Sequence, residues 1–113
     1  MKIIVYDDSV TAIIDRYGSD ARIDDVHVRY LGEELTGSDY KRLEEAHFKR
    51  ENVRMGEGDP AQESADWYYV TGPRNRCFRI LGKLPKEKCF VVTVDESLAD
   101  EADRLGYRVQ HQI

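Results

Sequence analysis

Acidic residues follow three short apolar segments of this chain, an arrangement typical of metal-binding carboxylates. In chain order, residues 2–6 precede Asp7 and Asp8, residues 26–30 precede Asp39, and residues 89–94 precede Asp95 and Glu96. If these segments are neighbouring strands, their acids gather at one edge of a sheet, where negative charges repel one another. Divalent cations relieve that repulsion and prefer oxygen ligands. The spacing therefore predicts a carboxylate site for magnesium or manganese.

The segments themselves are predicted to be buried parallel strands. Residues 2–6, 26–30, 67–71 and 89–94 are rich in β-branched and aromatic side chains and are too short for helices. Uninterrupted apolar runs are typical of strands that helices cover on both faces. Ligands of such sheets bind outside the carboxyl ends of the strands, where the strand order reverses. The acids would lie at that edge.

Helical periodicity connects the strands. We expect helices over about 9–17, from about 36–39 to 51, over 75–81 and over 97–105, and a short final strand at 107–110. Residues 52–65 contain Gly56, Gly58 and Pro60 and are predicted to form a long loop that is mobile or functional. This alternation predicts a single α/β domain over residues 1–113. Its architecture would be a three-layer α/β/α sandwich around a mainly parallel sheet of four to five strands.

Composition narrows the class of protein. A chain of 113 residues with 41% apolar and 35% charged residues can bury one core under a charged surface. No apolar run approaches the roughly 20 residues that span a bilayer, and no signal peptide precedes the first strand, so we expect a cytoplasmic protein without membrane contact. The net charge of −5 argues against a non-specific nucleic-acid coat. Cys77 and Cys89 lack metal-site spacing and are expected to be buried thiols.

One segment is basic despite the net negative charge. It contains Arg74, Arg76, Arg79, Lys83, Lys86 and Lys88 with a single acid, Glu87. A basic strip beside an acidic pocket suits an anionic substrate. The alternative is a solvated helix face with no binding role.

Three motifs resemble small PIN-like domains. Residues 4–10, Ile-Val-Tyr-Asp-Asp-Ser-Val, resemble the first strand of that family with its terminal acid. Residues 26–32 with the later Gly-Ser-Asp at 37–39 resemble the second strand and the Asp that opens the next helix. Residues 91–98 resemble the later strand that ends in Thr-x-Asp, and residues 106–109 the closing strand.

The resemblance implies a PIN-like ribonuclease that needs magnesium or manganese, often the toxin of a toxin–antitoxin pair. It places metal-binding and catalytic carboxylates at Asp7, Asp39 and Asp95, with Asp8 or Glu96 as a helper. We expect the RNA backbone to contact Arg74, Arg76 and Arg79. The partners implied are RNA and a cognate inhibitor protein, and a homodimer is compatible with the resemblance.

The chain departs from the family pattern before Asp95. Its central segment is longer than that of a minimal member, and the strand at 67–71 ends in Gly72-Pro73 rather than in an acid. If that strand is the equivalent of the family's later strand, the third carboxylate is missing. Asp66 lies at the opposite end of the strand and cannot replace it.

Each acid also has a structural interpretation. Asp7 and Asp8 could interact favourably with the dipole of the following helix. Asp39 could complete a capping box with Thr36, and Asp95 could cap the last helix.

The competing function is a non-catalytic binding module of the same fold, acting as an inhibitor, an antitoxin-like protein or an interaction partner. Trp67, Tyr68 and Tyr69 are most simply sheet residues, although one of them could stack on a base.

A response-regulator receiver domain also begins with a strand that ends in paired acids. That class needs a phosphorylatable Asp after its third strand, and Thr71-Gly72-Pro73 provides none. A phosphatase with Asp-x-Asp after its first strand is excluded by Ser9.

Overall fold

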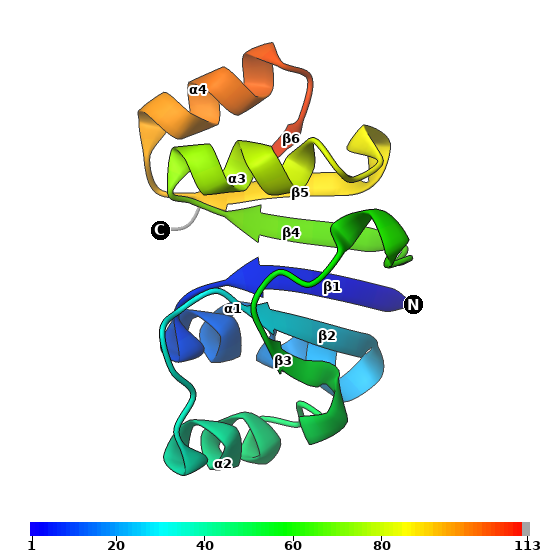
Figure 1. Ribbon diagram of the computed structural model, residues 1–113, viewed down its shortest axis with the longest axis vertical. Coiled ribbons are helices and arrows are strands. Elements are labelled where there is room, and N and C mark those ends of the chain that lie inside the picture. Colours follow the sequence, from blue (N-terminus) through cyan, green and yellow to red (C-terminus); the bar gives the residue numbers. More distant parts are fainter. Residues whose placement is uncertain (112–113) are drawn as a thin grey trace.

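The computed structural model describes residues 1–111 (Figure 1). The strands are β1 (Lys2–Asp7), β2 (Asp25–Tyr30), β3 (Val53–Met55), β4 (Trp67–Thr71), β5 (Cys89–Thr93) and β6 (Arg108–His111). The helices are α1 (Val10–Ile23), α2 (Gly37–Glu45), α3 (Arg74–Leu81) and α4 (Glu96–Arg104), with short 3₁₀ turns at Arg50–Asn52, Pro60–Gln62 and Lys86–Lys88.

Within residues 1–111 the strands form one six-stranded sheet in the order β3-β2-β1-β4-β5-β6, and all neighbouring strands are parallel. The predicted α/β class and parallel sheet are confirmed. The predicted number of strands, four to five, is too low. The extra strand is β3, which lies inside the segment 52–65 predicted as a loop.

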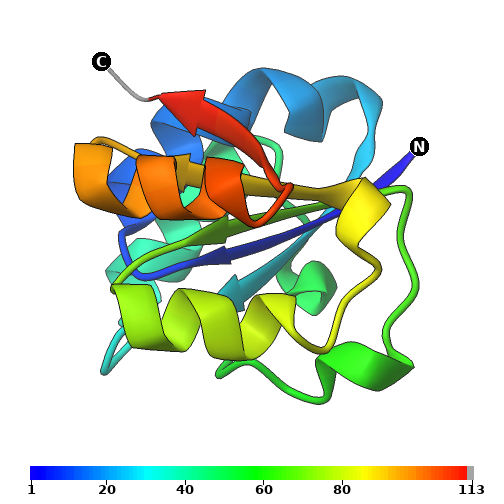
Figure 2. The same cartoon turned by 90° about the horizontal axis from the view of Figure 1, so that it is seen from above.

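Helices cover the two faces of the sheet in pairs, which produces three layers (Figures 1 and 2). On one face, α1 and α2 pack over the β1–β2–β3 half through Ile13, Tyr17 and Leu43. On the other face, α3 and α4 pack over the β4–β5–β6 half through Ile80, Leu98 and others. Strand residues alternate between these two cores, so Ile3 and Val5 face α1 whereas Ile4 and Tyr6 face α3.

Two helices differ in length from the sequence prediction. α1 continues through Gly18 to Ile23, because an isolated glycine costs a helix only about 1 kcal/mol and Tyr17 anchors it to the sheet. α2 ends at Glu45 rather than near residue 51. His47 then adopts a left-handed conformation with φ 76°, and the backbone N–H of Phe48 returns to the carbonyl of Leu43. This reversal buries Phe48 against the sheet and leaves His47 exposed.

The strand order reverses between β1 and β4. From β1 the chain steps outward to β2 and β3, and from β4 it steps outward in the opposite direction to β5 and β6. In doubly wound sheets this switch point forms a crevice outside the carboxyl ends of the two central strands. No helix within residues 1–111 is long and apolar enough to cross a membrane.

Candidate functional site

The switch point holds a small cavity of about 190 Å³ between the carboxyl ends of the strands and α1. We call it the switch crevice; its walls include Asp7, Ser9, Arg16, Thr71, Gly72 and Val92. A larger hollow of about 530 Å³ lies along α4 and the start of β6, away from these strand ends. The switch crevice is therefore the place where the fold would position a small polar ligand.

Asp7 is the most buried acid of the crevice, with 2% of its surface exposed. Its Oδ1 accepts hydrogen bonds from the backbone N–H groups of Asp8, at 2.7 Å, and Ser9, at 3.2 Å. Its Oδ2 accepts one from Arg16 Nη1 at 3.1 Å. Burial raises the pKa of this carboxyl, and the Arg16 guanidinium and the two N–H groups only partly offset that effect. Asp7 is thus a desolvated carboxylate whose two oxygens are both already bound.

Asp8 pairs with Arg76 of α3. Arg76 Nη2 lies 3.0 Å from Asp8 Oδ2 and also donates to the carbonyl of Gly72 at 2.6 Å. The same guanidinium reaches the carbonyl of Leu31 at 3.4 Å. Arg76 therefore connects the segments that follow β1, β2 and β4.

Asp39 lies at the same edge but is used by its own helix. Thr36 is the N-cap of α2; its hydroxyl accepts from the Asp39 N–H at 3.1 Å, and Asp39 Oδ2 accepts from the Thr36 N–H at 2.9 Å. These hydrogen bonds lower the pKa of Asp39. The capping box of the structural interpretation is confirmed.

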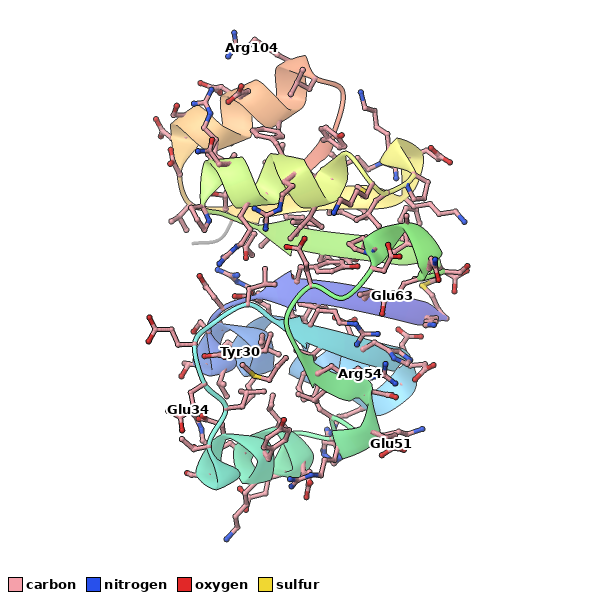
Figure 3. All side chains as sticks on the ribbon, in the orientation of Figure 1. Tyr30, Glu34, Glu51, Arg54, Glu63 and Arg104 are labelled. Carbon is pink, nitrogen blue, oxygen red and sulfur yellow. The ribbon has the colours of Figure 1, made fainter. Side chains whose placement is uncertain are left out.

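Tyr30 lies close enough to these acids for their charges to act on its hydroxyl. It ends β2 at the edge to which the strand arrows point (Figures 1 and 3). Desolvation raises the pKa of its hydroxyl, with further contributions from the charges of Asp39, Asp8 and Asp7. The negative charges of all three acids therefore act on this hydroxyl.

Asp95 lies farther from the switch point. It follows β5, and β4 separates β5 from β1. Its Oδ1 accepts from the backbone N–H groups of Ser97, at 2.9 Å, and Leu98, at 3.3 Å, so it caps α4 as the structural interpretation proposed. Glu96 occupies the exposed first turn of α4. The strand beside β1 is β4, which runs into Gly72-Pro73 without an acid.

Within residues 1–111 no three His, Cys, Asp or Glu side chains are arranged to hold a metal ion. All of the predicted acids follow the carboxyl ends of strands, as the sequence suggested, but each of Asp7, Asp8, Asp39 and Asp95 has a protein partner. The assignment of metal ligands stays a prediction.

The predicted basic strip is largely neutralised by acids. Arg74 pairs with Glu101 on α4. Arg79 Nη2 lies 2.7 Å from Glu57 Oε2, and Lys83 approaches the same carboxylate at 3.9 Å. Arg74 and Arg79 are more than half exposed. The predicted contact of Arg74, Arg76 and Arg79 with RNA stays a prediction.

A second surface lies on the α1 side of β4, β5 and β6. Among residues 1–111, α3 and α4 both pack on the opposite side, so only the edge of α1 flanks this half of the sheet (Figure 2). Half-buried aromatic side chains occupy it: the rings of Tyr69 and Phe90 stack 4.9 Å apart at 8°, and Trp67 meets Phe90 edge-on at 5.3 Å. Arg108 lies over Trp67 and Phe90, 5.2 and 5.6 Å from the ring centroids. We call Trp67, Tyr69, Phe90 and Arg108 the open face.

The sequence indicates only part of the open face. It identifies Trp67, Tyr68 and Tyr69 as sheet residues able to stack, but Tyr68 is buried on the opposite face, in the core beneath α3 and α4. It does not single out Phe90 and Arg108. The available signal is their alternation with Val91 and Val109, which places Phe90 and Arg108 on the face away from α4. That face becomes visible only when the helices after β4 and β5 are known to lie on one side.

Comparisons with protein-family models, with curated proteins and with solved structures find no match. The fold and the two surfaces define the class of this protein: a doubly wound, all-parallel α/β domain with an acidic switch crevice and a half-uncovered sheet.

Proposed function

We propose that this chain is a non-catalytic binding module that recognises another protein through its open face. The observation that supports this most is the aromatic composition of the open face, where Trp67 and Tyr69 both contact Phe90 and all three rings remain partly exposed. Aromatic side chains and arginine are enriched in the cores of protein interfaces. Monomeric domains rarely leave such a cluster on the surface without a use.

The bonding of the acids supports the same proposal. Asp39 and Asp95 satisfy backbone N–H groups at helix starts, and Asp7 is held by Arg16. Such hydrogen bonds are what a helix N-terminus needs for stability, independent of any reaction. A metal ion at Asp7 would compete with Arg16 for the carboxylate. We therefore derive no catalytic step at this site.

Thermal unfolding with and without millimolar magnesium or manganese tests this proposal. A preformed metal site is stabilised by about 2.7 kcal/mol when the ion is present at about 100 times its Kd. The binding module should show the same melting temperature with either ion and with a chelator, and should leave single-stranded and structured RNA intact. A metal-dependent rise in melting temperature together with RNA cleavage would overturn it.

The second candidate is the PIN-like, metal-dependent ribonuclease, which has a specific observation of its own. The charges of Asp7, Asp8 and Asp39 meet at Tyr30, and the pKa of the buried Asp7 is raised at the switch point. Perturbed carboxyls in a crevice are candidates for catalytic sites. In this proposal Asp95 and Glu96 would complete the acidic site.

Two variants test the ribonuclease. Replacing Asp7 by Asn should abolish cleavage of RNA if Asp7 is catalytic, while circular dichroism shows an unchanged fold. An Arg76→Ala change should weaken RNA binding more at low salt than at high salt if Arg76 contacts phosphate. Arg74→Ala and Arg79→Ala serve as comparisons, because both side chains are more exposed than Arg76.

A further inference from the structure

We infer that the partner of the open face is a second copy of this chain, related to the first by a two-fold axis. This inference rests on the proposed function, because it names the protein that the binding module recognises. Three features of the face support it: an ordered apolar centre, opposite charges on its two sides, and a position at the free edge of the sheet.

The centre of the open face is pre-organised. Tyr69 stacks on Phe90, Trp67 meets Phe90 edge-on, and Tyr17 of α1 meets Tyr69 edge-on at 5.4 Å. Each ring is therefore fixed by another ring before a partner arrives. Binding then costs little side-chain entropy, which favours affinity for a given buried area.

Val94 is a further exposed apolar residue beyond the rings, just after the carboxyl end of β5. It borders the switch crevice and is 71% exposed, whereas Val92, between it and Phe90, is buried at 1%. The exposed apolar surface of the open face is therefore made by its three rings. A cluster of apolar side chains on one face is typical of a protein contact.

The two sides of the open face carry opposite charges. Arg108 lies on the β6 side, over Trp67 and Phe90. Asp20 and Asp24 lie on the α1 side, close enough to Tyr69 for both charges to act on its hydroxyl. The amino terminus also pairs with Asp24 at 3.6 Å, which leaves Asp20 as the acid without a salt-bridge partner in the described residues.

A two-fold axis through the aromatic centre satisfies both charges at once. When this axis lies in the interface and runs parallel to the strands, it places the β6 side of each copy opposite the α1 side of the other. Each Arg108 then faces an Asp20, and the contact occurs twice. Single-stranded nucleic acid fits less well. Its phosphates would approach Asp20 and Asp24 on a chain whose net charge is −5.

Complementary charge reversal tests this arrangement. In a dimer of Arg108→Glu, both contacts would bring the new carboxylate against Asp20, and in a dimer of Asp20→Lys both would bring the new ammonium group against Arg108. Each variant alone should therefore dimerise at least about tenfold more weakly than the natural chain. A mixture of the two variants should form a mixed dimer in preference to either homodimer, because it avoids the doubled like-charge contacts.

The measurement is sedimentation equilibrium of the full chain across a concentration series. The emission of Trp67, the single tryptophan, should shift to shorter wavelength as the dimer forms. Arg104→Glu is the matched control, since it reverses an exposed charge on α4, away from the open face (Figure 3). It should dimerise like the natural chain, and melting curves should show all variants folded.

Three outcomes would overturn the inference: a natural chain that stays monomeric at every concentration, a mixture that remains as weak as its components, or an Arg108→Glu monomer that loses binding to single-stranded RNA. None of these depends on the metal and RNA-cleavage experiment, so the two-fold dimer and the non-catalytic assignment can fail separately.

Discussion

Arg29 and Glu63 form an ion pair that fastens the segment between β3 and β4 to the sheet. Arg29 Nε lies 2.8 Å from Glu63 Oε1, and the Arg29 side chain is only 6% exposed. The hydroxyl of Tyr6 adds a hydrogen bond to Glu63 Oε2 at 3.3 Å, and burial together with the Glu63 charge raises the pKa of Tyr6. Glu63 lies over the face of the sheet on which α3 packs, where no helix shields β2 in residues 1–111 (Figure 3). The pair therefore holds the segment between β3 and β4 over a face of β2 that no helix covers in the described residues.

Arg29→Met should destabilise the protein through the charge it leaves behind. The Glu63 carboxylate would keep its partly buried position without a cation, and breaking such a pair costs about 3–5 kcal/mol of unfolding free energy. Urea unfolding measures this loss. Arg79→Met is the control, because it breaks the exposed pair with Glu57 on the same segment and should cost less than about 1 kcal/mol. Equal losses in the two variants would contradict the anchoring role of Arg29.

The sequence predicted the strands better than the connections between them. β1, β2, β4 and β5 agree with the prediction within a residue at each end, because β-branched and aromatic side chains dominate these segments and most of those side chains are buried. β3 was missed because only Val53 of its three residues is buried, so the segment has no apolar run to detect. Its strand character comes from hydrogen bonding to β2 at the edge of the sheet.

For the candidate site, the sequence predicted which acids follow strands but not which of these strands are neighbours. The sequence indicated correctly that Asp7 and Asp95 follow parallel strands. It could not indicate that β4 lies between their strands, because strand order depends on which faces the crossover segments cover. It also could not show that Arg16, nine residues after Asp7, would reach back along α1 to hold that carboxylate.

Asp7→Asn should change the pH dependence of stability. The folded state raises the pKa of Asp7 above its ordinary value of 3.8, so the protonated form favours folding. The stabilising contribution of this group is present below the unfolded pKa and is lost as the pH rises through the folded pKa. Asn removes that contribution. The unfolding free energy of the natural chain minus that of the variant should therefore fall as the pH rises above about 4.

Urea titrations of both proteins at a series of pH values would measure this difference. A difference that grows with pH would mean that Arg16 and the two backbone N–H groups outweigh burial, which reverses the direction assigned to the pKa. Asn keeps the size of the side chain and can still accept from the N–H groups of Asp8 and Ser9. The comparison therefore isolates the charge.

Cys77 and Cys89 should be unreactive in the folded protein. Both are free and buried, and burial raises the pKa of each thiol to about 12. The thiolate is the reactive form, so labelling by a thiol reagent near pH 8 should be much slower than that of an exposed cysteine. In concentrated guanidinium chloride both thiols should react at once. Rapid labelling of either in the native state would show that the core around α3 and β5 opens easily.

Substitution of Asp95 separates its capping role from a role in metal binding. Asp95→Ala removes the acceptor for the N–H groups of Ser97 and Leu98 and should cost about 1 kcal/mol of unfolding free energy. Asp95→Asn keeps an oxygen in that position and should cost only a few tenths of a kcal/mol, since Asn and Asp are comparable N-caps. Urea unfolding compares the two. Asp100→Ala, on the exposed side of the same helix, controls for the loss of a negative charge. If Asp95 is only a capping residue, the order of stabilities is the same with and without magnesium. If Asp95 is a metal ligand, magnesium stabilises the natural chain, and both Asp95 variants lose this stabilisation.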